Sequence, residues 1–171
     1  MSEEPVIKRR NIIYPRIELR TGHLELILPN DADEKQILEK YAGWIDEKQQ
    51  QIDKIERESQ NLSLSPRTKE EYASLIKELA GKKTGRPVKI QMRKMKSKWA
   101  SCSPNGTITV NTLGQNLPDN YVQYIISHEI LHLTHRKHDA LFLAALEKEF
   151  PDMAQLEKDL AGYWFRLNKE I

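Results

Sequence analysis

Apolar and polar residues alternate near the start of the chain with the two-residue period of a half-buried β-strand. The apolar positions of this alternation are Ile17, Leu19, Leu24, Leu26 and Leu28. Between the two runs lie Thr21-Gly22-His23, whose residue types suit a tight turn, and Pro29 ends the second run. The pattern predicts a β-hairpin over residues 12–29.

After residue 30 the apolar spacing changes to that of an amphipathic helix. The positions that follow this spacing are Ile37, Tyr41, Trp44 or Ile45, and Ile52. Asn30 and Asp31 can cap the start of the helix, and its second half is so polar that we expect a projecting arm. A second helix is expected with Ser65 as N-cap, Pro66 at its first position and Gly81 at its end. The two helices form a predicted helical excursion over residues 31–81.

The remaining segment, 87–171, combines a hairpin with helices. A strand is expected through Val88, Ile90 and Met92, and the letters SPNG supply a turn before a second strand, TITVN. From Pro118 onward the pattern is helical, with segments that begin DNYVQ, DALFL and PDMAQ. The expected class is therefore α+β, with a small mixed sheet and C-terminal helices around a core at 87–171.

Length and composition limit the other possibilities. A chain of 171 residues suits one domain, 1–171, and 39% hydrophobic with 30% charged residues is typical of a globular protein. No apolar run approaches the length of a membrane span, and the charged start lacks the apolar stretch of a secretory signal. Cys102 is the single cysteine, which excludes an intrachain disulfide and favours a reducing compartment, by default the cytoplasm. The net charge of +2 indicates neither a nucleic-acid nor a membrane partner.

The stretch SHEILHLTHRKH, residues 127–138, contains four of the five histidines. Within it, His128, Glu129 and His132 form a His-Glu-x-x-His pattern. Residues four apart share one face of a helix, so His128 and His132 can reach a single metal ion. Glu129 is turned about 100° away, which suits a carboxylate that takes a proton from water at the metal. Because the flanking residues are apolar, the pattern predicts a buried metal site rather than a solvated face.

A catalytic zinc site needs a third protein ligand and an open position. His138 is the expected third ligand, because the polar residues before it let the helix end and the chain swing back. His135 is the competitor, but it lies about 10.5 Å along the helix axis from His128, too far for both to hold one ion easily. Glu147 and Glu149, on the next helix, are the remaining candidates.

Read with its upstream segment, the chain resembles the YgjP-like metallopeptidase family, a relative of the SprT-like and Wss1-like zinc proteases. The residues that carry the resemblance are RKMKSKWASC (93–102), TITVN (107–111), Leu117-Pro118, YIISHEILHLTHRKH (124–138) and Phe142. The resemblance is strong over about 50 residues in total. The family usually has glycine where this chain has Ala100, and commonly an aromatic residue where it has Leu143. These two departures concern the wall of the cleft rather than the metal ligands.

The resemblance implies a zinc-dependent metallopeptidase of zincin-like fold, in which a small sheet packs on the active-site helix. It implies His128, His132 and His138 as zinc ligands and Glu129 as the general base that activates water for peptide hydrolysis. Its partners would be peptide or protein substrates. The alternative function is a catalytically silent, zinc-stabilised binding module for nucleic acid or protein–DNA substrates. The basic residues of segment 93–98 could contact phosphate groups, although no recognised nucleic-acid module accompanies them. The sequence does not indicate an oligomeric state.

Three further residue types lie near this site in the sequence: a tryptophan, a cysteine and two tyrosines. Trp99 is expected in the core or the cleft wall, and Cys102 as a small buried apolar residue. Tyr121 and Tyr163 are the candidates for an additional group that stabilises an oxyanion, because both are near the helices concerned in sequence.

Overall fold

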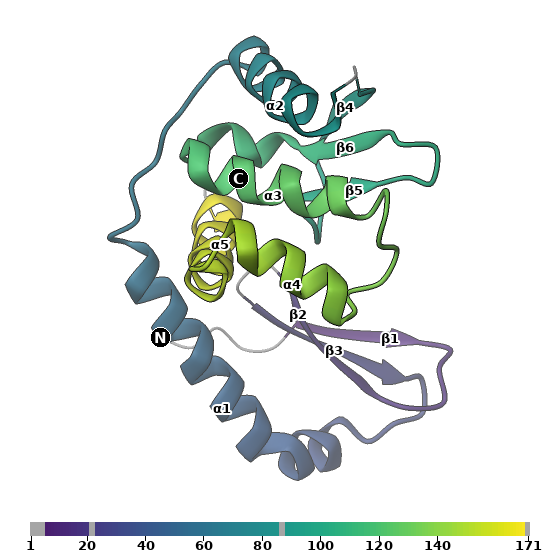
Figure 1. The fold of residues 1–171 in the computed structure, drawn as a ribbon. Coiled ribbons are helices and arrows are strands. Elements are labelled where there is room, and N and C mark those ends of the chain that lie inside the picture. Colours follow the sequence, from purple (N-terminus) through teal and green to yellow (C-terminus); the bar gives the residue numbers. More distant parts are fainter. Residues whose placement is uncertain (1–5, 21–22, 86–87, 170–171) are drawn as a thin grey trace. The chain divides into compact units, whose positions relative to one another are not determined.

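The computed structural model describes residues 6–20, 23–85 and 88–169 (Figure 1). Backbone contacts divide the chain into two compact units. One comprises Met1–Leu62 with Ala161–Ile171, and the other comprises Ser63–Leu160. The predicted subdivision placed residues 63–81 with the N-terminal excursion, but in the structure they belong to the second unit. That 1–171 functions as a single domain stays a prediction.

The first unit contains a three-stranded sheet of order β1-β3-β2 (Figure 1). β2 (Arg16–Arg20) pairs antiparallel with β3 (His23–Pro29), which confirms the two predicted strands; the predicted turn at Thr21 and Gly22 lies outside the described residues. β1 (Val6–Arg10), which the sequence did not predict, pairs in parallel with β3. Its charged residues suit an edge strand, and β3 in the centre carries the fully buried Leu26 and Leu28.

The long helix of the first unit, α1, spans Glu34–Ser59. Its N-cap is Asp33, whose carboxylate accepts a hydrogen bond from the backbone N–H of Gln36 at 3.2 Å, so the predicted caps at Asn30 and Asp31 are wrong. The side chains of α1 are mostly exposed or half-buried, and Ile52 is its fully buried apolar residue. That its second half is a projecting arm stays a prediction. No helix among the described residues is long and apolar enough to cross a membrane.

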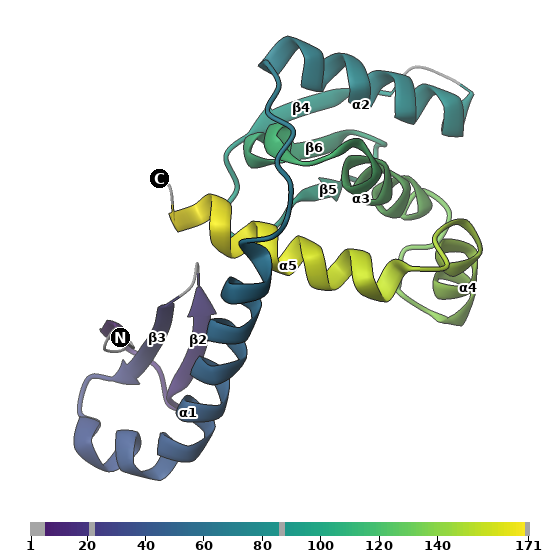
Figure 2. The same ribbon diagram turned by 90° about the vertical axis from the view of Figure 1, so that its left-hand side faces the viewer.

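The second unit is built on a mixed sheet of order β4-β6-β5. β6 (Ile108–Asn111) lies in the centre, parallel to β4 (Ile90–Arg93) and antiparallel to β5 (Ala100–Cys102). Figure 2 shows α2 (Lys69–Thr84) beside β4, while α3 (Asp119–Leu131) contacts β5 and α2. The α+β class, with a small mixed sheet packed on the helix that carries the histidine pattern, is confirmed.

The strand expected after Val88 is interrupted in the structure. Residues 94–99 form a loop between β4 and β5, so the hairpin joins β5 to β6 through the turn that the SPNG letters predicted. The fully buried side chain of Asn111 explains the interruption: its amide donates hydrogen bonds to the carbonyl oxygens of Met95 and Lys98, at 2.8 and 2.9 Å. These bonds hold the loop where a continuous strand would otherwise run.

The remaining elements of this unit are helical. A 3₁₀ helix, η1 (Thr112–Asn116), follows β6, and α4 spans Ala140–Glu149. α5 (Met153–Lys169) begins in this unit, and its residues from 161 onward belong to the first unit. The largest side chains with at most 1% exposure in the second unit are Tyr72, Ile76, Ile108, Val110, Leu117, Ile126, Phe142 and Leu146.

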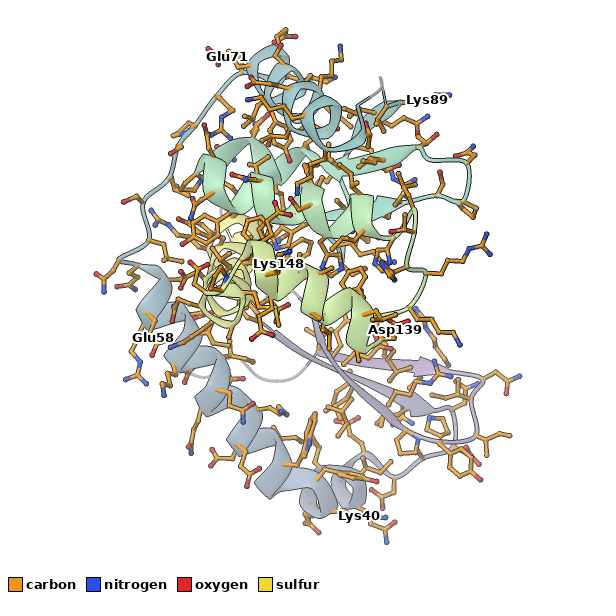
Figure 3. All side chains as sticks on the ribbon, in the orientation of Figure 1. Lys40, Glu58, Glu71, Lys89, Asp139 and Lys148 are labelled. Carbon is orange, nitrogen blue, oxygen red and sulfur yellow. The ribbon has the colours of Figure 1, made fainter. Side chains whose placement is uncertain are left out.

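Thr68, rather than Ser65, is the N-cap of α2. The Thr68 hydroxyl accepts a hydrogen bond from the backbone N–H of Glu71 at 3.2 Å, and the Glu71 carboxylate accepts one from the backbone N–H of Thr68 at 2.7 Å. Figure 3 shows Glu71 at this end of α2. The reciprocal capping box satisfies two backbone donors at once, which explains why the helix begins three residues later than predicted. At its other end, α2 continues past Gly81 to the left-handed Gly85.

Thr68→Ala is expected to lower the free energy of unfolding by about 1 kcal/mol, because it removes the side-chain cap of α2. Ser65→Ala is the matched control and should change it by less than about 0.5 kcal/mol. Urea unfolding of the two variants, followed by helical circular dichroism, measures the difference. Equal destabilisation by both substitutions would contradict the assignment of the cap.

Candidate metal centre

α3 carries the first two histidines of the site. Its buried face, which includes Val122, Ile125 and Ile126, fixes the helix in the unit. His128 lies in the last turn, and His132 is the C-terminal cap residue. The helix ends at Leu131, whose carbonyl accepts hydrogen bonds from the backbone N–H of His135 at 2.7 Å and from the backbone N–H and hydroxyl of Thr134 at 3.0 and 3.1 Å. Side-chain bonds of this kind compete with helix continuation.

The chain turns back after α3 and brings His138 to the other two rings. The Nε2 atom of His138 is 3.0 Å from Nε2 of His128 and 3.1 Å from Nε2 of His132. Among the described residues, these three histidines are the group whose ligand atoms lie close enough together to hold a metal ion. The structure therefore brings together the three residues that the sequence proposed as ligands.

The chemistry of this donor set fits a cation. Each imidazole Nε2 carries either one hydrogen or one lone pair, so three converging Nε2 atoms cannot all satisfy one another by hydrogen bonds. Two imidazole nitrogens bound to one tetrahedral zinc ion would lie about 3.3–3.4 Å apart. The observed separations of 3.0 and 3.1 Å are close to that value. One cation can accept all three lone pairs.

Two contacts orient the rings. The Nδ1 atom of His132 lies 3.0 Å from the backbone carbonyl oxygen of His135. A hydrogen on Nδ1 that is donated to this carbonyl leaves Nε2 of His132 with a lone pair directed at the other rings. The ring of Phe142, fully buried, lies 5.0, 4.9 and 4.7 Å from the rings of His128, His132 and His138, measured between centroids.

The loop that carries His138 leads directly into α4. Asp139 caps this helix, because its carboxylate accepts a hydrogen bond from the backbone N–H of Phe142 at 2.9 Å; Figure 3 labels Asp139 at this end of α4. The cap fixes the helix start two residues after His138, at Ala140, and places Phe142 against the imidazoles. Phe142, which the sequence noted only as part of the resemblance, is thus the packing platform of the site.

The protonation of the site favours metal binding. Burial, helped by the neighbouring His138 and His132, lowers the pKa of His128 to about 4. At neutral pH the imidazole of His128 is therefore uncharged, which is the form that binds metals. Burial raises the pKa of the Glu129 carboxyl, while His132, a backbone hydrogen bond from Cys102 and the Lys98 ammonium act in the opposite direction.

The side chains considered as alternative third ligands lie outside the group of ligand atoms that the three histidines form. His135 contributes its backbone carbonyl to His132, as described above. Glu149 accepts a hydrogen bond from the Ser127 hydroxyl at 3.1 Å and forms an ion pair with Lys83. Glu147 is exposed on α4 and is not part of the three-histidine group. The geometry thus favours His138 over each of these alternatives.

A cavity of about 660 Å³ lies beside the three histidines, within the second unit. Its walls come from β5 and the loop before it, from α3, and from residues 157 and 160 of α5. Glu129, His128, His132 and His138 all line it. Trp99 lies in the wall as expected, and so does Ala100, one of the two departures from the family pattern, whereas Leu143 is not among the lining residues.

Some expectations about this cavity need correction. Cys102 is half-buried and lines the cavity rather than lying in the core, and burial together with the nearby Glu129 raises the pKa of its thiol. The hydroxyl of Tyr121 donates to Asp159 at 2.8 Å, and neither Tyr121 nor Tyr163 is a lining residue. The tyrosine in the wall is Tyr124.

Sequence reasoning missed Tyr124, Arg136 and Glu157, which also line the cavity. Tyr124 precedes His128 by four residues, so helical spacing would have placed it on the same face. Glu157 has no such signal, because its position depends on how α5 packs against α3.

Comparison with known proteins gives the class of this site. A family model described as a YgjP-like metallopeptidase domain matches residues 63–163, more than half of the chain. The chain belongs to the YgjP-like metallopeptidase family. The match begins at the same residue as the second compact unit. Membership implies a divalent metal ion, and the three histidines are a group able to hold one.

Two solved structures are also similar. The metallopeptidase zymogen abylysin of Pyrococcus abyssi is 32% identical, with 52% of this chain and 90% of that chain covered and a TM-score of 0.45. The metallopeptidase zymogen jannalysin of Methanocaldococcus jannaschii is 18% identical, with 58% and 94% covered and a TM-score of 0.46. No curated protein matches the chain.

Proposed function

We propose that this protein is a zinc-dependent peptidase that hydrolyses peptide bonds with Glu129 as general base. The observation that carries the proposal is the convergence of three imidazole Nε2 atoms beside a cavity that Glu129 also lines. Three histidines with an open side match the ligand set of catalytic zinc sites. A zinc ion bound there would supply Lewis acidity, which acidifies water and polarises a carbonyl group.

The residues of the chain have separate roles in metal binding and proton transfer. His128, His132 and His138 hold the ion, and the His135 carbonyl keeps the His132 ring in its binding orientation. The Glu129 carboxylate takes a proton from the attacking water and passes it to the amine that leaves. Burial moves the pKa of Glu129 toward the neutral range, and a group that must both accept and release a proton works best when its pKa is near the working pH.

The loop before β5 supports this arrangement. Asn111 binds the carbonyls of Met95 and Lys98, and the backbone N–H of Asn111 donates to the Trp99 carbonyl at 2.7 Å. These contacts fix the loop that leads into β5. β5 contacts α3, and the backbone of Cys102 donates a hydrogen bond to the Glu129 carboxylate. The substrates would be peptides or proteins that enter the cavity, and the single cysteine favours activity in a reducing compartment such as the cytoplasm.

Removal of the metal tests the proposal. Dialysis against a chelator is expected to lower the cleavage of a denatured protein substrate by at least about tenfold, because the ion supplies several kcal/mol of stabilisation to the transition state. Addition of one equivalent of zinc should restore the activity, measured by the release of peptides. Cleavage that persists in protein shown to be free of metal would contradict the proposed chemistry.

A further inference from the structure

Glu157 is the acidic residue of the cavity that the proposed mechanism does not use. The charged side chains in the cavity wall, histidines apart, are Lys98, Glu129, Arg136 and Glu157. Glu129 is the proposed base, and Lys98 lies close enough to it to influence its pKa. Glu157 lies on α5, a separate element, and its exposed carboxylate is available to a ligand in the cavity.

Tyr124 holds Glu157 in place. The Tyr124 hydroxyl donates a hydrogen bond to Oε1 of Glu157 at 2.7 Å. The tyrosine itself is 3% exposed, and its ring packs edge-on against Phe150 at a centroid distance of 5.2 Å. Burial and the neighbouring Glu157 carboxylate raise the pKa of Tyr124, so the hydroxyl remains a donor. A carboxylate can accept about four hydrogen bonds, so the one from Tyr124 leaves Glu157 able to bind a further donor.

The cavity wall carries charges of both signs close to α3. Tyr124, which holds Glu157, precedes His128 by four residues, about 6 Å along the helix axis. Arg136 follows the end of α3, in the opposite direction along the chain. The wall therefore carries an acidic and a basic side chain in addition to Glu129 and Lys98. The wall also includes Ile125 and Leu160, whose apolar side chains can pack against the methylene stem of a long basic residue.

We propose that Glu157 determines substrate specificity by binding the ammonium or guanidinium group of a lysine or arginine side chain close to the peptide bond that is cleaved. The inference rests on the proposed function, which sets the position of that bond beside Glu129. Glu157 contacts the substrate away from the reacting atoms. An acidic side chain at the same position of the peptide would be repelled.

A purely structural role for Glu157 makes a different prediction. The Tyr124–Glu157 bond joins α3 to α5, and so does the bond from the Tyr121 hydroxyl to Asp159 at 2.8 Å. Asp159 is not a lining residue of the cavity. If both acids only fasten α5 to α3, loss of either charge should have similar effects on stability and similar effects on peptide preference. Asp159→Asn is therefore the matched control for Glu157→Gln, which keeps an oxygen that can accept the Tyr124 bond.

The test measures binding without turnover. Zinc-loaded Glu129→Gln protein is titrated calorimetrically with two peptides blocked at both ends, identical except for a central lysine or norleucine. The lysine peptide should bind about fivefold more tightly, and the difference should shrink at high salt. Addition of Glu157→Gln should abolish the preference, Asp159→Asn should preserve it, and Glu157→Lys should make the lysine peptide the weaker ligand.

The outcomes separate this inference from the proposed function. Equal binding of the two peptides, or a lysine preference that survives Glu157→Gln, would overturn the role of Glu157 even if the wild-type chain cleaves peptides. A lysine preference that depends on Glu157, in a chain that cleaves neither peptide, would retain the binding role and contradict the peptidase proposal. A preference lost equally in Asp159→Asn would show that α5 packing, rather than the Glu157 charge, is responsible.

Discussion

Glu129→Gln is expected to reduce peptide cleavage by about a hundred- to ten-thousandfold while the protein retains its metal. Glutamine matches the size of glutamate but cannot take a proton from water, so the change removes the proton transfer and leaves the three imidazoles unchanged. Glu129 lies next to His128 in the chain but is not part of the group of ligand atoms. Initial rates of peptide release and zinc content by atomic absorption, measured on the same preparation, check both parts of the expectation.

Glu147→Gln provides the matched control, since it makes the same chemical change on the exposed side of α4. It should alter neither the rate nor the metal content. Loss of zinc in Glu129→Gln would mean that Glu129 serves as a ligand. Cleavage at the wild-type rate in zinc-loaded Glu129→Gln would contradict its role as the base.

His138→Ala is expected to weaken metal binding by more than about a hundredfold, because even the supporting contacts around metal ligands are worth ten- to a hundredfold. His138 is exposed, so its removal should not unfold the chain. His135→Ala should weaken binding less than tenfold, because the contact that His135 makes with the His132 ring comes from its backbone carbonyl and is kept in alanine. Competition with a chromophoric zinc chelator measures both affinities, and circular dichroism checks the fold.

The comparison of these two variants separates the third-ligand hypotheses. Equal losses in His135→Ala and His138→Ala would contradict the observed arrangement of the rings. If His138→Ala bound zinc with unchanged affinity, the third ligand would have to be another group, such as Glu149. In the structure Glu149 is bonded to Ser127 and Lys83.

Local patterns predicted the parts of the fold that depend on local physics. Helical spacing was sufficient to place His128 and His132 together, because four residues make about one turn. The polar residues after His132 indicated that the chain could turn back, and the structure brings His138 within 3.1 Å of both partners. Strands β2 and β3 followed from their alternation in the same way.

Competing local signals explain several of the wrong predictions. Two possible caps precede α2, and the reciprocal bonds between Thr68 and Glu71 decide in favour of Thr68. At the end of α3 the Leu131 carbonyl accepts hydrogen bonds from the backbone N–H of His135 and from the backbone N–H and hydroxyl of Thr134, so helical and tighter bonds compete there. Propensity alone does not rank such alternatives, since each differs by only about 1 kcal/mol.

Other features depend on contacts between distant residues. β1 has few apolar residues, and its strand forms through pairing with β3, with Lys8 bonded to Glu25 at 2.6 Å. The place of Glu157 in the cavity wall requires α5 to lie beside α3, with Glu157 33 positions after Tyr124 in the chain. No spacing rule along the sequence indicates a contact at that separation.

Anomalous diffraction from crystals of the zinc-loaded protein, recorded on both sides of the zinc absorption edge, tests the central claim most directly. We expect one zinc peak per chain, about 2.0–2.1 Å from the Nε2 atoms of His128, His132 and His138, with one side open to the cavity that Glu129 lines. A zinc peak at other residues, a carboxylate in the place of His138, or no peak at the three histidines would contradict it.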